Sequence, residues 1–157
     1  MKRIITLGII TIMLFVLSAC SQNNTPEKAA ENFVISLYTA DPERMVDCVP
    51  EFILRQMAES YGASLDNKEG LINIMKSNIR QEDISDCVIT SVKRDDDSPV
   101  LDEYKDNFDN YGVTNEDLSK IDEYCMVSVN AKVDDENIQN IVFCVKYDDV
   151  WCAVDID

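Results

Sequence analysis

Apolar residues recur at three- and four-residue steps between residues 26 and 79, which is the spacing of one helix face. Thr25-Pro26 and Asp41-Pro42 each place a capping residue before a proline and predict the starts of two helices. A third helix is predicted over residues 51–61, where Gly62 provides a left-handed stop. The first half is therefore predicted to be helical. Core-facing residues are predicted at Ala30, Phe33, Val34, Leu37, Leu71, Ile72, Met75 and Ile79, and Phe52, Ile53, Met57 and Tyr61 fall in helical register.

A fourth helix is predicted after Asp66, because Glu69 three residues later completes the form of a capping box. Beyond this helix the pattern changes, and residues 87–93, which are rich in Val, Ile and Thr, predict a first strand. Helical spacing returns between Pro99 and Tyr111, and a short turn of helix is expected from Asn115. The sequence thus predicts a helical insertion after the first strand.

The last third of the chain alternates between apolar and polar residues, which predicts strands. These strands cover Tyr124–Val133, Ile138–Tyr147 and Val150–Ile156. Acidic turns join them at Asp134-Asp135-Glu136 and at Asp148-Asp149. The prediction is a three-stranded antiparallel meander at the end of the chain.

If the last turn has two residues, both faces of this meander are largely apolar. An antiparallel sheet that is covered on one side only usually shows polar residues on the other. The N-terminal helices can cover one face, and we expect the second to be covered by the inserted helix of residues 99–111 or by a second copy of the protein. The predicted fold class is α+β: N-terminal helices packed on a curved, mainly four-stranded antiparallel sheet, with a helical insertion between the first two strands.

The first 20 residues have the anatomy of a secretory signal, with Lys2 and Arg3 followed by an apolar run over residues 4–17. This run is shorter than the roughly 20 residues of a membrane-spanning helix. Leu17-Ser18-Ala19-Cys20 resembles the lipobox of bacterial lipoproteins. The resemblance implies that a diacylglycerol is joined to Cys20 and that the preceding peptide is removed. Cleavage near Ala19 by a general signal peptidase is the alternative.

The expected organisation is therefore a lipoprotein signal peptide over residues 1–19, a lipidated Cys and tether over residues 20–25, and a single α+β domain over residues 26–157. The expected location is the extracytoplasmic side of the cell membrane, to which lipid on Cys20 holds the chain. Which membrane carries the anchor is left open by the sequence.

Charge and composition exclude several classes of activity. The chain has a formal charge of −16, and loss of Lys2 and Arg3 with residues 1–19 brings it to −18, which disfavours nucleic-acid binding. Histidine is absent, so catalysis by a Ser-His-Asp or Cys-His group and His-ligated metals are excluded. The four glycines are scattered and form no phosphate-binding loop. No catalytic residue and no cofactor is predicted.

Acidic runs and cysteines are the remaining candidates for chemistry. Asp95-Asp96-Asp97 and Asp134-Asp135-Glu136 lack the alternate acids and central glycine of a helix-loop-helix calcium site, so solvated turns are expected and no metal. No cysteine pair has Cys-x-x-Cys spacing. A two-residue turn at Asp134-Asp135 would place Cys125 opposite Cys144, where a disulfide can form; buried free thiols are the alternative.

A wider resemblance comes from the order of elements: the lipobox, the helix from Pro26, the Ala40-Asp41-Pro42-Glu43 break and a terminal hairpin with Asp149-Val150-Trp151. This order is similar to small bacterial lipoproteins with the nuclear transport factor two-like, or cystatin-like, cone fold. The resemblance implies helices packed into a curved sheet, an arrangement that leaves a pocket in some members of the family. The aromatic residues Phe33, Tyr38 and Trp151 are the candidates to line such a pocket. The absence of His and the helical insertion depart from that family's pattern.

Three hypotheses about function follow from these observations. The first is a non-catalytic module of the cell envelope that binds a small ligand or an envelope protein. The second is a small isomerase- or dehydratase-like enzyme, which needs an inward carboxylate with a raised pKa. The third is a structural or immunity-type lipoprotein without a pocket, which acts through a partner and an exposed apolar patch.

Overall fold

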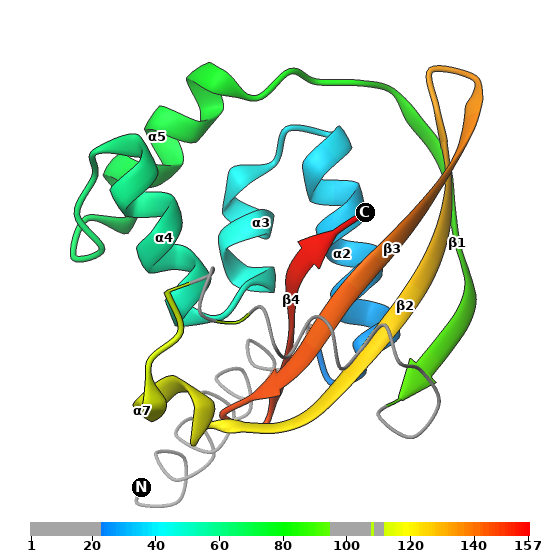
Figure 1. Cartoon of the computed structure of the whole chain (residues 1–157). Coiled ribbons are helices and arrows are strands. Elements are labelled where there is room, and N and C mark those ends of the chain that lie inside the picture. Colours follow the sequence, from blue (N-terminus) through cyan, green and yellow to red (C-terminus); the bar gives the residue numbers. More distant parts are fainter. Residues whose placement is uncertain (1–22, 95–107, 109–111) are drawn as a thin grey trace, which may run out of the picture.

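The computed structural model describes residues 23–94, 108 and 112–157. One antiparallel sheet has the strand order β1-β2-β3-β4. Helices precede it in the chain, and a short helix lies between its first two strands, so the predicted α+β class is confirmed (Figure 1). The elements are α2 (Pro26–Tyr38), α3 (Pro42–Cys48), α4 (Glu51–Tyr61), α5 (Lys68–Asn78), β1 (Ile84–Arg94), α7 (Asn115–Leu118), β2 (Ile121–Val133), β3 (Glu136–Tyr147) and β4 (Val150–Ile156).

Two of the first helices, α2 and α3, begin at the predicted capping residues. Thr25 Oγ1 accepts a hydrogen bond from Lys28 N at 3.3 Å, and an Asp41 carboxylate oxygen accepts one from Arg44 N at 3.0 Å. Each cap satisfies an amide of the first turn, which has no partner inside the helix. Gly62 ends α4 with φ of 64°, as predicted from its position.

The predicted capping box at the start of α5 is wrong. Asn67 caps this helix, and its Oδ1 accepts a hydrogen bond from Gly70 N at 2.9 Å. Asn67 directly follows Asp66 in the sequence, and Asp and Asn are about equally good in this role. The helix begins at Lys68, and Glu69 is thus its second residue, too early to complete a box with Asp66.

Both predicted two-residue turns are present, and they fix the register of the sheet. Asp134 and Asp135 have φ of 47° and 69°, and Asp148 and Asp149 have φ of 49° and 66°. Positive φ at both central residues matches the twist of the flanking strands. β3 is therefore in register with β2, with Val127 opposite Val142.

Helix α2 covers one face of the sheet and packs against all four strands (Figure 1). Beneath it lie the buried side chains of Val127, Val129, Val142 and Cys144. The Sγ of Cys144 lies 3.9 Å from the carbonyl oxygen of Pro26, at the start of this helix. The predicted cover of the first face by an N-terminal helix is confirmed.

The opposite face of the sheet is also buried, through Met126, Phe143, Val145 and Val154. Phe108, the described residue of the predicted helix over 99–111, packs here with its ring 5.8 Å from those of Phe143 and Tyr124. The rest of that predicted helix lies outside the described residues. Part of the second cover thus comes from the same chain, and a homodimer stays a prediction.

Candidate functional site

A shallow depression lies between α2 and the first residues of β1. It has a volume of about 370 Å³ and is open to solvent. Its lining combines apolar and acidic groups that are far apart in the sequence: Glu31, Ile35, Ile84, Ser85, Asp86 and Cys87. An arrangement of this kind suits a ligand group that is both apolar and positively charged.

The thiol of Cys87 in this depression is held in its neutral form. Burial, together with the nearby carboxylates of Glu31 and Asp86, raises its pKa to about 11. A neutral thiol is a poor nucleophile and a poor metal ligand. Over the part of the chain that the structure describes, no group of three or more Cys, Asp or Glu side chains could hold a metal ion. The Cys87 thiol therefore offers a contact rather than a reactive group.

The three residues predicted to line a pocket lie in different surroundings. Phe33 is buried in the core. The hydroxyl of Tyr38, at the C-terminal end of α2, donates a hydrogen bond to Asn140 Oδ1 at 3.0 Å. The Trp151 ring lies under Arg94, with 5.7 Å between the guanidinium carbon and the ring centroid. None of the three lines the depression between α2 and β1.

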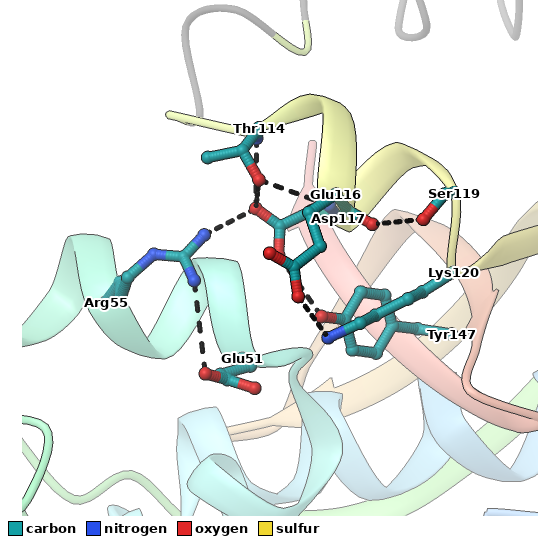
Figure 2. Close-up of polar contacts among 8 residues, drawn as sticks. All are labelled: Glu51, Arg55, Thr114, Glu116, Asp117, Ser119, Lys120 and Tyr147. Carbon is teal, nitrogen blue, oxygen red and sulfur yellow. Dashed lines mark hydrogen bonds and ion pairs between the residues drawn. The ribbon is translucent and has the colours of Figure 1, made fainter.

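A buried carboxylate lies elsewhere, where α7 meets α4 and the end of β3 (Figure 2). Asp117 is 3% exposed. Its Oδ2 accepts hydrogen bonds from Thr114 N at 2.9 Å, Thr114 Oγ1 at 2.7 Å and Arg55 Nη2 at 2.5 Å. Its Oδ1 accepts one from the Tyr147 hydroxyl at 3.2 Å. Four donors from three elements therefore converge on one side chain.

These donors keep Asp117 ionised. Burial acts to raise its pKa, but hydrogen bonds from the side chain and backbone of Thr114, together with Arg55, outweigh it and hold the pKa at about 2. Burial and the bond to Asp117 raise the pKa of Tyr147, whose phenol remains a donor at neutral pH. The hypothesis of an isomerase- or dehydratase-like enzyme needs an inward carboxylate with a raised pKa, whereas the pKa of Asp117 is lowered.

Asp117 acts as a structural connection between elements. It forms a capping box with Thr114 at the start of α7 and ties that helix to Arg55 of α4 and Tyr147 of β3. The sequence predicts the helical turn here but not the cluster. The pattern Thr114-x-x-Asp117 is a detectable capping signal, whereas the contacts with Arg55 and Tyr147 depend on the fold.

The sequence matches no protein-family model, and no curated protein or solved structure is significantly similar to it. Across the described ranges 23–94 and 112–157, no helix is long and apolar enough to cross a membrane. Leu17, Ser18, Ala19 and Cys20 precede the described residues, so the lipobox and the lipidation of Cys20 stay predictions.

The two cysteines of the predicted disulfide lie directly opposite each other on β2 and β3, as the two-residue turn requires. Cys125 and Cys144 are both buried, and both are free thiols in the structure. Burial raises the pKa of Cys144 well above its usual value, and the adjacent Cys125 thiol raises it further. The register is confirmed, while the disulfide itself stays a prediction.

Proposed function

We propose that this chain is a lipoprotein of the cell envelope, held on the extracytoplasmic side of the membrane by lipid on Cys20. The carrying observation is the sequence Leu17-Ser18-Ala19-Cys20, which follows a positive segment and an apolar run too short to span a bilayer. The fold supports this proposal, because the predicted cleavage before Cys20 would leave the packed α+β structure whole.

The anchored domain is proposed to be a non-catalytic binding module. Its candidate binding surface is the depression between α2 and β1, where Ile35 and Ile84 provide apolar contacts and Glu31 and Asp86 provide negative charge. An amphipathic cation or a positively charged segment of an envelope protein has the complementary chemistry. Support for binding rather than thiol chemistry is that the Cys87 thiol in the depression is held in its neutral form.

Substitution Cys20→Ser tests the anchor. The full-length protein, expressed in a bacterium, is expected in the membrane fraction and to require detergent for its release, because acyl chains hold it there. The Cys20→Ser protein is expected to lose this association. Membrane fractionation, combined with the mass of the N-terminal peptide, measures both the location and the acyl groups.

The matched control for the anchor is Gln22→Ala, which changes the tether and keeps the thiol. It is expected to remain in the membrane fraction with acyl groups on Cys20. If Cys20→Ser leaves the location unchanged, or if the wild-type N-terminal peptide carries no lipid, the proposed anchor is wrong.

Substitution Ile35→Lys tests the binding surface. The new ammonium group would occupy the depression between Glu31 and Asp86 and compete with a positively charged ligand. Native mass spectrometry of the purified protein is expected to show a bound species that this variant loses. Val88→Lys, on the exposed part of β1, is the control that should keep it. A wild-type protein without any bound species, or equal binding by both variants, would contradict the proposal.

A further inference from the structure

The chain is fixed to the domain from Asn23 onward. Asn23 is buried, and its Oδ1 accepts a hydrogen bond from Asn32 Nδ2 at 2.9 Å. Its Nδ2 donates to the carbonyl oxygen of Asp47 at 3.3 Å, and its own carbonyl accepts from Trp151 N at 3.2 Å. Three elements, α2, α3 and β4, therefore hold this residue in place.

Only a short length of chain separates this fixed point from the proposed anchor. Asn23 is the third residue after Cys20, so their Cα atoms can be at most about 11 Å apart even when the chain is fully extended. The headgroup layer of one leaflet is roughly 5–8 Å thick. If acyl chains on Cys20 enter the bilayer, Asn23 is held within a few ångströms of the headgroups, and the surface around it must touch them.

That surface includes two exposed apolar side chains. Asn23 bonds to Trp151, which adjoins Val150 and the β3–β4 turn, and Asp148 N in this turn donates to the carbonyl oxygen of Lys120 at 3.0 Å, just beyond α7. Val150 is 43% exposed, and Leu118 at the end of α7 is 40% exposed. We name the surface around the buried Asn23, with Leu118, Lys120 and Val150, the tethered end.

The depression lies toward the other end of the sheet. Ile84, in its lining, pairs with Val133 beside the β2–β3 turn, whereas Ile121 at the start of β2 pairs with Tyr147 beside the β3–β4 turn. The 13 residues of β2 separate the two turns by about 40 Å if the strand is fully extended. Figure 1 shows α7 and the β3–β4 turn at one end of the sheet and the β2–β3 turn at the other.

We propose that the tethered end lies against the lipid bilayer, with Leu118 and Val150 among the headgroups, and that the depression is directed away from the membrane. This inference rests on the proposed lipidation of Cys20. Lys120 and Lys146 pair with Glu116 and Asp149 on this surface, so its charges have both signs. The short tether, rather than charge attraction, sets the orientation.

Lipid-dependent quenching of a fluorophore at two positions tests the orientation. The full-length lipidated protein carries Cys87→Ser, which removes the half-buried thiol, and either Leu118→Cys or Val88→Cys. Val88 is the matched control, because it is 48% exposed and pairs with Asn130 toward the far end of β2. Each variant is labelled with an NBD maleimide and reconstituted in phosphatidylcholine vesicles with or without headgroup spin-labelled phosphatidylcholine.

The expected result is a loss of NBD fluorescence at position 118 and no loss at position 88 when the spin-labelled lipid is present. Equal quenching at both positions, or quenching at neither in vesicle-bound protein, would overturn the orientation and leave the anchor intact. Iodide in the aqueous phase provides a second quencher. If position 118 is shielded from iodide but not quenched by the spin-labelled lipid, a protein rather than the bilayer covers this surface, and the proposed orientation is wrong. Absence of acyl groups from Cys20 in the mass spectrum would instead refute the proposed anchor, and this inference with it.

Discussion

Replacement of Phe143 by alanine is expected to lower the free energy of unfolding by about 3–5 kcal/mol, since it removes a buried ring and leaves a cavity. Phe143 lies on the sheet face opposite α2, in contact with the rings of Phe108 at 5.8 Å and Tyr124 at 6.4 Å between centroids. A loss of this size is a large part of the roughly 5–15 kcal/mol that stabilises most domains. Urea denaturation followed by circular dichroism measures it.

Val88→Ala is the matched control for this experiment, because it shortens an apolar side chain of the same sheet at an exposed position. Its expected effect is within about 0.5 kcal/mol. A double-mutant cycle with Phe108→Ala adds a test of the second cover, and a coupling of about 0.5–1.5 kcal/mol is expected for contacting rings. If Phe143→Ala and the control have equal effects, the second face is not part of the core.

Replacement of Asp117 by asparagine is expected to lower the free energy of unfolding by about 2 kcal/mol at pH 7. The carboxyl pKa falls from 3.8 to about 2 on folding, a difference that corresponds to about 2 kcal/mol. Arg55 is partly exposed and stays hydrated in the variant, so the loss should remain below that of a fully buried ion pair. Urea denaturation of both proteins between pH 7 and pH 2 is the measurement.

The pH dependence gives this second prediction its specific signature. A folded-state pKa below the unfolded value provides stability that is complete above about pH 5 and is lost as the pH falls toward 2. The difference between wild type and Asp117→Asn should therefore shrink over this range. Glu116→Gln removes an exposed neighbouring charge and should leave the wild-type profile nearly unchanged. A difference that is constant with pH would contradict the proposed role of the charge.

Local signals account for the parts of the fold that the sequence predicted. The starts of α2 and α3 depend on one capping side chain and the proline after it, so a few neighbouring residues decide them. The terminal hairpins depend on alternation and on two-residue turns, which together define the register that places Cys125 opposite Cys144. The start of α5 shows the limit of such local signals, because the cap is Asn67 rather than the adjacent Asp66 and the two residue types cap a helix about equally well.

The candidate site depended on contacts that no local pattern encodes. Its lining brings Ile35 of α2 beside Ile84 of β1, and the offset between a helix and a sheet comes from the packing of many side chains. The same holds for Asp117, whose partners Arg55 and Tyr147 are 62 and 30 residues away in the chain. Phe33, Tyr38 and Trp151 were grouped because they are aromatic, and aromatic character alone does not define a shared location.

The packing of α2 against all four strands also determines when the domain can fold. This helix is the first described element, whereas the strands that cover its inner face extend to Ile156. The contact between Cys144 and Pro26 spans 118 residues, and closing so long a loop slows folding. During synthesis α3 can pack against α2 early, but the face of α2 that covers the sheet has no strand partner until the last strands have emerged. We therefore expect the core between α2 and the sheet to be completed only at the end of synthesis, so that much of the chain can still be threaded through a narrow channel before then.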